Sequence, residues 1–201
     1  MSDATMNDLE IVTTSSRFAE VIANASRRPR VALDIESNGL HRYPERICLF
    51  QLAVDGSVFL IDPTPALDTR PLGRLLTDAL VEKVLHSADY DIRSLDRDLG
   101  YRIRNLFDTS IAAAFVGSTS LGLATVLQEY LGVWVPKSKR QQRADWTNRP
   151  LTSEARHYAA EDVRHLERVR DVLVQRLSDL SRLEWVAEEC ERLAQVKYKT
   201  P

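Results

Sequence analysis

Two acidic side chains interrupt a short apolar stretch near the start of the chain. Residues 31–36 read Val-Ala-Leu-Asp-Ile-Glu, a strand-forming run that contains Asp34 and Glu36. Because side chains alternate along a strand, these two carboxylates share one face, while Leu33 and Ile35 share the other. Neighbouring carboxylates repel each other, and burial deprives them of hydration, so a buried pair needs compensation. The strand therefore either leaves this face in solvent or binds a divalent cation, for which carboxylate oxygens are suitable ligands.

A second acidic element lies in a long stretch with helical spacing. Tyr158 and Asp162 are four positions apart and are therefore neighbours on one helix face. Ala159 and Ala160, between them, keep the helix narrow and allow another element to approach closely. Leu166 continues the face with an apolar side chain, which places the tyrosine and the aspartate at the border of the core. An ordinary surface hydrogen bond between the two is the alternative.

A third acidic element, residues 86–92, reads His-Ser-Ala-Asp-Tyr-Asp-Ile. We expect Ser87 to cap a helix here, and the helix dipole favours acids in a first turn. These two effects alone account for both Asp89 and Asp91. Both acids also flank the apolar stripe of the helix, so the spacing does not decide which one faces inward. His86 is expected to be a strand-end histidine with a hydrogen-bond partner rather than a catalyst.

The remaining pattern predicts an α/β domain with a mixed sheet flanked by helices. Two strand-forming runs, 47–54 and 57–61, enclose Asp55-Gly56, a two-residue turn signal that predicts an antiparallel hairpin. A Thr-Thr-Ser-Ser segment and Gly100 supply a start and a stop signal for two of the helices. The expected helices cover 15–25, 89–99, 109–115, 123–131, 153–177 and 182–197, and short strands are expected at 84–86 and near Leu106.

Composition excludes several classes of protein. A chain of 201 residues, 44% of them hydrophobic, is long enough to form a core without disulfide or zinc support. Its 27 basic and 29 acidic residues argue against a protein that coats nucleic acid through a global positive charge. The apolar runs fall far short of the ~20 residues of a membrane span, and the N-terminus is too polar for a signal peptide, so we expect a cytoplasmic location. Cys48 and Cys190 are expected to be free thiols rather than a disulfide.

One segment without apolar periodicity, residues 135–147, is predicted to be a loop. It is either a solvated surface loop or a loop that contacts phosphates. Trp146, near its end, is a candidate for stacking on a base, although a packing role is favoured. Arg42 and Arg46 are further candidates for phosphate contacts. The four cations of the segment are Lys137, Lys139, Arg140 and Arg143.

Taken together, these segments resemble ribonuclease D and its relatives in the DEDD superfamily of 3′–5′ exonucleases, on the tyrosine-bearing branch. The resemblance extends from about Val31 to Leu173. It rests on the segments LDIESNGLHRYPERICLFQLA, VLHSADYDIRSL, LFDTSIAAAF, KSKRQQRADWTNRPL and YAAEDVRHL. The resemblance implies a ribonuclease H-like fold, which is consistent with the expected hairpin and the later helices.

Motif by motif, the resemblance implies five catalytic residues. The first motif falls on Asp34 and Glu36. The second motif has its aspartate five positions after a histidine, which selects Asp91. The third motif, Tyr-x-x-x-Asp, falls on Tyr158 and Asp162. In such a site the four acids would bind two Mg²⁺ or Mn²⁺ ions, and the tyrosine would orient or deprotonate the attacking water.

The activity implied by the resemblance is hydrolysis of single-stranded RNA from a free 3′ end, with release of nucleoside 5′-monophosphates, in RNA processing or decay. A DNA exonuclease of the same superfamily and a non-catalytic nucleic-acid-binding module are the alternatives, because only contacts to the 2′-hydroxyl separate RNA from DNA. No membrane partner is expected, and a monomer and a homodimer both remain open.

The sequence departs from the family pattern at two places. Ala144 stands before the Asp-Trp pair, where the family often has a serine. The given sequence ends at Pro201, whereas ribonuclease D continues into helical domains that add grip on the substrate. We therefore expect residues 1–178 to form the exonuclease domain and residues 179–201 to form a helix that packs on it, without such domains.

Overall fold

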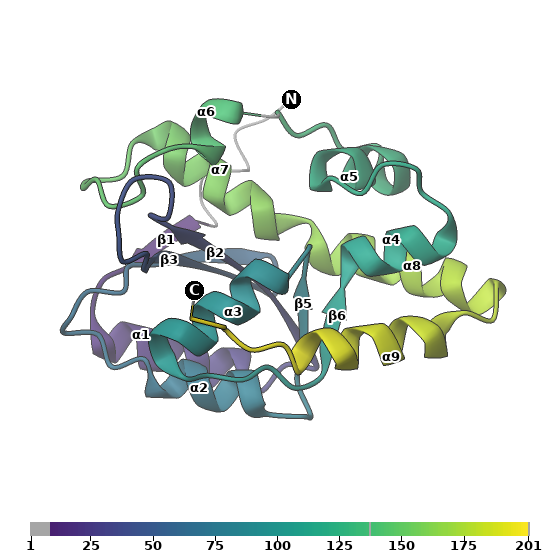
Figure 1. Cartoon of the computed structure of the whole chain (residues 1–201), viewed down its shortest axis with the longest axis horizontal. Helices are drawn as coiled ribbons and strands as arrows, with labels where there is room; N and C mark the ends of the chain where they lie inside the picture. The colour runs from purple at the N-terminus through teal and green to yellow at the C-terminus, as the bar shows by residue number, and fades with distance from the viewer. Residues whose placement is uncertain (1–8, 137, 201) are drawn as a thin grey trace.

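The computed structural model describes residues 9–136 and 138–200 and has a six-stranded mixed sheet between two layers of helices (Figure 1). Its strands are β1 (Leu9–Val12), β2 (Arg30–Ser37), β3 (Ile47–Val54), β4 (Ser57–Ile61), β5 (Glu82–Leu85) and β6 (Leu106–Asp108). Its helices are α1 (Ser15–Ala25), α2 (Arg70–Thr77), α3 (Asp89–Leu99), α4 (Thr109–Val116), α5 (Leu123–Leu131), α6 (Lys139–Gln142), α7 (Ser153–Arg164), α8 (Leu166–Asp179) and α9 (Leu183–Ala194).

The strands lie in the order β1-β4-β3-β2-β5-β6. β3 runs antiparallel to both of its neighbours, β4 and β2. The pairs β1–β4, β2–β5 and β5–β6 are parallel. The expected α/β class with a mixed sheet is thereby confirmed, although the sequence pattern did not indicate β1.

The hairpin between β3 and β4 is confirmed. Asp55 and Gly56 have φ values of 51° and 80°, the left-handed conformations that a two-residue turn between twisted strands requires. Val54 pairs with Ser57 directly before and after this turn. The turn therefore fixes the register of β4 on β3.

β2 occupies the middle of the sheet, between β3 and β5. Its register with β3 places Asp34 opposite Gln51 and Glu36 opposite Leu49, and the register then shifts between Glu36 and Ser37. This irregularity ends the regular pairing of the strand, and the chain continues into residues 38–46. The strand that carries the first two candidate acids thus ends directly beside them.

α7 and α8 cover one face of the sheet, and α1, α2 and α3 lie on the other (Figure 1). α7 contacts β2, β3 and β4, whereas α8 contacts β2 and β5. Ala159 and Ala160 of α7 are fully buried, which agrees with the close approach expected from their small side chains.

The expected single helix over residues 153–177 is in fact two helices. His165 separates them with φ −109° and ψ −1°. The break lets the chain change direction as it passes from β3 and β4 to β5, so that both helices follow the twisted sheet. No glycine or proline stands at this point, so the break has no signal in the sequence.

The segment 135–147 is also more ordered than a plain loop. It contains the short helix α6, and the Ser138 hydroxyl caps this helix by accepting a hydrogen bond from the Gln141 N–H at 3.2 Å. Lys137 lies outside the described residues.

The last helix, α9, packs against β6 and α4. It ends at Ala194 rather than at Lys197, and its buried residues are Val186, Cys190 and Ala194. Cys48 and Cys190 are free and buried, as expected. Among the described helices, none is both long and apolar enough to cross a lipid bilayer.

Ser87 does not cap α3, contrary to expectation. Its φ is 58°, and the helix begins at Asp89 without a side-chain cap. The turn is held instead by Asp108, whose carboxylate oxygens accept hydrogen bonds from the N–H groups of Ser87 at 3.1 Å and Ala88 at 2.8 Å. The same carboxylate caps α4 by accepting from the N–H and the hydroxyl of Ser110, both at 2.8 Å. One buried acid therefore fixes the start of both α3 and α4.

We expect Asp108→Ala to lower the free energy of unfolding by about 2–4 kcal/mol, because it leaves several buried N–H donors without partners and removes a helix cap. Urea unfolding followed by circular dichroism measures this loss. The matched control is Asp89→Ala, which removes an exposed ion pair with Arg93 on α3, and such a pair contributes less than about 1 kcal/mol. Equal losses in the two variants would contradict the role of Asp108.

Candidate active site

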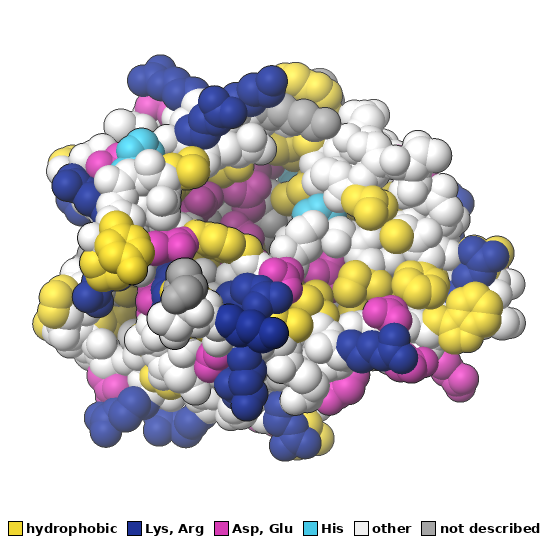
Figure 2. Space-filling model, viewed as in Figure 1, with side chains coloured by type: hydrophobic (Ala, Val, Ile, Leu, Met, Phe, Trp, Pro, Cys, Tyr) yellow, Lys and Arg dark blue, Asp and Glu magenta, His cyan; other side chains and the backbone are white. Residues whose placement is uncertain are grey.

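Three elements that are distant in the sequence deliver the candidate acids to one place. β2 carries Asp34 and Glu36, α3 carries Asp91, and α7 carries Asp162. One oxygen from each of Asp34, Glu36 and Asp162 lies within 4.8 Å of the others. Figure 2 shows acidic side chains at the floor of a hollow on this face of the molecule. The arrangement offers hard oxygen ligands on several sides of one small volume, which suits a divalent cation.

The structure decides between the two acids at the start of α3. Asp91 is 5% exposed, and its charge is among those that raise the pKa of Glu36. Asp89 is exposed and pairs with Arg93 at 2.8 Å. Asp91 is therefore the inward-facing residue, in agreement with the motif.

The alternation along β2 also follows the expectation. Leu33 and Ile35 are buried, at 2% and 6% exposure. Asp34 and Glu36 are half-buried and line a common pocket with α7. The fully solvated alternative for this face is therefore wrong.

Burial and mutual repulsion shift the pKa values of the four acids in one direction. Burial raises the pKa of Asp34 to about 7. Burial, followed by the charges of Asp34, Asp162 and Asp91, raises the pKa of Glu36 well above its usual value. The pKa values of Asp91 and Asp162 are likewise raised, first by burial and then by the charge of Asp34. An ionised cluster is therefore costly unless cations compensate for it.

Tyr158 lies beside the acids. Burial, followed by the charges of Asp162 and Glu36, raises the pKa of its phenol far above the usual value. The side chain of Gln142 forms a hydrogen bond with it, and its ring lies 6.1 Å from that of Trp146. At neutral pH this phenol keeps its proton and offers a hydrogen-bond donor next to the carboxylates.

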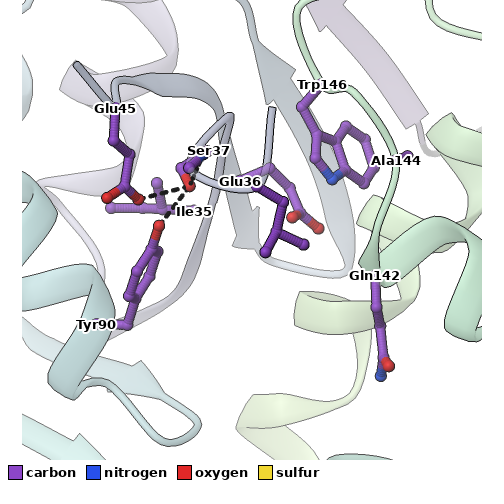
Figure 3. Close-up of a pocket in the computed structure, with 10 residues that line it drawn as sticks. Ile35, Glu36, Ser37, Glu45, Tyr90, Gln142, Ala144 and Trp146 are labelled. Atoms are coloured by element: carbon purple, nitrogen blue, oxygen red, sulfur yellow. Dashed lines mark hydrogen bonds between the residues drawn. The ribbon is translucent and has the colours of Figure 1, made fainter. Parts of the chain in front are cut away.

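Two pockets adjoin at this centre. The first, of about 350 Å³, we call the acid pocket; it is lined by Asp34, Glu36, His86, Ser87, Gly122, Leu123, Gln142, Tyr158 and Asp162. The second, of about 430 Å³, we call the side pocket (Figure 3); it is lined by Ile35, Glu36, Ser37, Gly39, Leu40, Glu45, Tyr90, Gln142, Ala144 and Trp146. Glu36 and Gln142 belong to both, so the two pockets share a wall.

Several of these pocket residues were not indicated by the sequence. Gln142 reaches the site because α6 packs against α7, and no periodic pattern marks that short helix. Ser37, Glu45 and Tyr90 lie next to candidate acids or in the segment after β2, and only the folded chain brings them together. The positions of Ser37 beside Glu36 and of Tyr90 beside Asp91 were the available signal, and Glu45 had none.

His86 has the expected partner on one ring nitrogen only. Its Nδ1 lies 2.8 Å from the hydroxyl of Thr109. Its Nε2 is buried and has no hydrogen-bond partner among the described residues, and the side chain lines the acid pocket.

The basic segment includes α6, whose last residue, Gln142, lines both pockets. Lys139, Arg140 and Arg143 are exposed, on α6 or directly after it. Arg42 is exposed and lies 3.9 Å from Asp145. Arg46 is also exposed. Exposure leaves the charges of Lys139, Arg140 and Arg143 accessible to an anion, whereas Arg42 faces Asp145.

Trp146 is 2% exposed and packs beside Tyr158. This burial favours the packing role over stacking on a base. Ala144, which stands where the family often has a serine, lines the side pocket and offers it no hydroxyl group.

Comparisons with known proteins agree with this geometry. The sequence model of a family described as 3′–5′ exonuclease matches residues 9–178. Ribonuclease D of Xanthomonas oryzae is 38% identical over 170 residues, which cover 84% of this chain and 46% of that protein. The chain thus spans about half the length of the curated relatives it matches.

Solved structures with the same fold include the catalytic core of RRP6 from Trypanosoma brucei. It has a TM-score of 0.92 and 30% identity, and the match covers 100% of this chain and 55% of that one. Brucella melitensis NrnC with bound Mg²⁺ has a TM-score of 0.77 and 25% identity, and the match covers 92% of this chain and 89% of that one. The fold is therefore that of the ribonuclease H-like exonuclease domains, and the chain belongs to the 3′–5′ exonuclease family, in which it resembles ribonuclease D.

Proposed function

We propose that this chain is a 3′–5′ exoribonuclease that removes nucleoside 5′-monophosphates from single-stranded RNA, in RNA processing or decay. The observation that carries the proposal is the convergence of Asp34, Glu36, Asp162 and Tyr158 from β2 and α7, with Asp91 of α3 close enough for its charge to act on Glu36. Three relatives of different kinds, ribonuclease D, an RRP6 core and NrnC, support it through similarity over most of the chain. A cytoplasmic location remains a prediction from the sequence.

The carboxylates suit two divalent cations, Mg²⁺ or Mn²⁺. Asp34, Glu36 and Asp162 would hold one ion, and Asp34 together with Asp91 would hold the other. The supporting features are the short oxygen separations among Asp34, Glu36 and Asp162 and the burial of Asp34 and Asp91. When bound, the ions would lower the pKa of a water molecule and offset the charge that develops on the phosphate.

Tyr158 supplies the hydrogen bond that positions the attacking water. Its phenol lines the acid pocket together with Asp162, and the side chain of Gln142 forms a hydrogen bond with it. Because packing against Trp146 fixes the ring, the hydroxyl keeps one direction relative to the acids.

The side pocket is the place for the terminal nucleoside. It adjoins Glu36, and its volume of about 430 Å³ is in the range that encloses a small ligand. A phosphodiester held at the acids would thus have one nucleoside in this pocket, and cleavage would release one nucleotide at a time. The exposed cations Lys139, Arg140 and Arg143 would contact phosphates of the remaining chain.

Domain organisation follows from the same reasoning. We propose that the exonuclease domain ends near residue 178 and that α9 is an addition that packs against β6 and α4. The family match, which ends at residue 178, supports this division.

The central test replaces the two acids at the start of α3 by their amides. Asp91→Asn is expected to lower kcat at least 10³-fold, because the cluster loses a charged ligand, whereas Asp89→Asn keeps the wild-type rate. Cleavage of a 5′-labelled oligoribonucleotide in Mg²⁺ or Mn²⁺, with a 3′-blocked copy and a DNA copy alongside, gives rate and direction. Cleavage of the DNA copy alone, cleavage of the blocked copy, or unchanged activity in Asp91→Asn would overturn the proposal.

The raised pKa of Asp34 predicts how stability depends on pH without metal. Between about pH 4 and pH 7 the folded chain retains a proton that the unfolded chain releases, so the contribution of Asp34 to stability falls as pH rises through this window. In EDTA at pH 8, Asp34→Asn is therefore expected to melt several degrees above wild type, and the difference should shrink towards pH 4.

Calorimetry in EDTA and in Mg²⁺ measures both effects. Mg²⁺ should raise the Tm of the wild type more than that of Asp34→Asn, because binding to the folded state adds stability. An Asp34→Asn variant less stable than wild type at pH 8 in EDTA would refute the electrostatic cost assigned to this acid.

Charge reversal tests whether Lys139 and Arg140 contact the phosphates of the substrate. Lys139→Glu with Arg140→Glu is expected to raise KM and to reduce the salt slope of binding by about 1.4, because each cation that neutralises a phosphate of a single strand adds ~0.7 to that slope. Arg27→Glu with Arg74→Glu changes the net charge equally at exposed positions before β2 and on α2, and should leave KM unchanged. If both double variants change KM and the salt slope equally, the effect comes from net charge and not from contacts of Lys139 and Arg140 with phosphates.

A further inference from the structure

A chain of hydrogen bonds forms one wall of the side pocket. Figure 3 shows the hydroxyl of Ser37 between the carboxylate of Glu45 and the hydroxyl of Tyr90. Ser37 directly follows Glu36, and Tyr90 directly precedes Asp91. These hydrogen bonds therefore involve the sequence neighbours of Glu36 and Asp91, two of the acids that surround the reacting phosphate in the proposed function.

The chemistry of the three groups fixes the direction of these hydrogen bonds. The carboxylate of Glu45, paired with Arg97 at 2.9 Å, only accepts, so Ser37 donates its single proton to Glu45 Oε1 at 2.9 Å. Ser37 Oγ then has only lone pairs left and accepts the proton of Tyr90. The tyrosine oxygen is thereby left with lone pairs alone for the pocket, and it can only accept.

The position of this acceptor is well fixed. Arg97 also pairs with Asp98 at 2.7 Å, and Asp98 accepts the N–H of Ile47 at the start of β3. A Cβ atom at Gly39 would lie 2.7 Å from Glu45 Cδ, so the backbone after β2 closes directly over the carboxylate. Groups held in this way provide geometric selectivity at little entropic cost on binding.

Tyr90 itself remains accessible to a ligand. Its side chain lines the side pocket, and the residue is 47% exposed. In a nucleotide whose phosphate lies at the acids, the sugar is the part joined directly to that phosphate. Ribose brings a 2′-hydroxyl donor to this region, and deoxyribose does not.

We propose that Tyr90 reads the sugar of the terminal nucleotide: its oxygen, oriented by Ser37 and Glu45, accepts a hydrogen bond from the 2′-hydroxyl and so favours RNA ends over DNA ends. This inference rests on the proposed function and adds to it a specificity-determining residue. It assigns to the side pocket a preference for a hydrogen-bond donor.

The test uses oligoribonucleotides that differ only in the last sugar, which is ribose, 2′-deoxyribose or 2′-fluororibose. Wild type is expected to prefer the ribose end about fivefold in kcat/KM, the effect of one neutral hydrogen bond, and to treat the other two ends alike. Tyr90→Phe should bring this ratio close to one. Ser37→Ala should also lower it, because the phenol proton is then no longer committed to Ser37.

The protein contains a matched control. Tyr130, Ser118 and Glu129 form a second tyrosine–serine–glutamate chain, in which Ser118 donates to Glu129 at 3.1 Å and bonds with the Tyr130 hydroxyl. These residues line neither the side pocket nor the acid pocket. Tyr130→Phe removes the same group from the same kind of chain and should leave the ribose preference unchanged.

A binding measurement distinguishes failure of this inference from failure of the proposed function. Fluorescence anisotropy with Asp162→Asn and with Tyr90→Phe/Asp162→Asn compares the ribose and deoxyribose ends without relying on turnover. If the wild type cuts nothing, the proposed function fails, while the binding ratio still decides the role of Tyr90. A ribose-to-deoxyribose binding ratio that Tyr90→Phe leaves unchanged would overturn the inference. So would a loss of binding in the Tyr90→Phe variant that depends on the amino groups of the terminal base instead of on its sugar.

Discussion

The repulsion among four half-buried or buried carboxylates is the constraint on which the centre of this molecule depends. Burial and the neighbouring charges raise the pKa values of Asp34, Glu36, Asp91 and Asp162 together. Apolar packing elsewhere must hold the three contributing elements in place against this repulsion. The apolar core between the sheet and the two helical layers supplies that packing.

Each acid is positioned by contacts that do not themselves take part in the chemistry. The small residues Ala159 and Ala160 bring α7 close to β2. Asp108, at the end of a three-residue strand, fixes the turn before α3 and so the place of Asp91. The same acid also caps the start of α4. A change at the end of β6 would therefore alter the position of Asp91 in the site.

Local patterns were sufficient for much of the fold. The Asp55-Gly56 turn, the bounds of α1 and the alternation along β2 follow directly from residue chemistry. Spacing alone did not separate Asp89 from Asp91, because both flank the apolar stripe and only tertiary packing buries one of them.

The features that the sequence did not predict depend on long-range contacts. The break at His165 follows the twist of a sheet and has no helix-breaking residue. Ser37 and Tyr90 are 53 residues apart, so their hydrogen bond cannot be inferred from spacing. The candidate acids and Tyr158 lie in short motifs that can be recognised in the sequence, whereas the walls of the pockets are assembled from many segments.

The register shift between Glu36 and Ser37 separates the part of β2 that carries the acids from the segment that follows the strand. Upstream of it, regular pairing with β3 holds the acids, and a length change there would turn them to the wrong face of the sheet. Downstream of it, Ser37 still pairs with Ile47, and the N–H of Asn38 donates to the carbonyl of Arg46. Residues 39–45, between these contacts, are outside the regular pairing and contribute to the side pocket, so changes there can reshape that pocket while the acids stay in place. Such a division would let related nucleases diverge in the ends they accept while inheriting one hydrolytic apparatus.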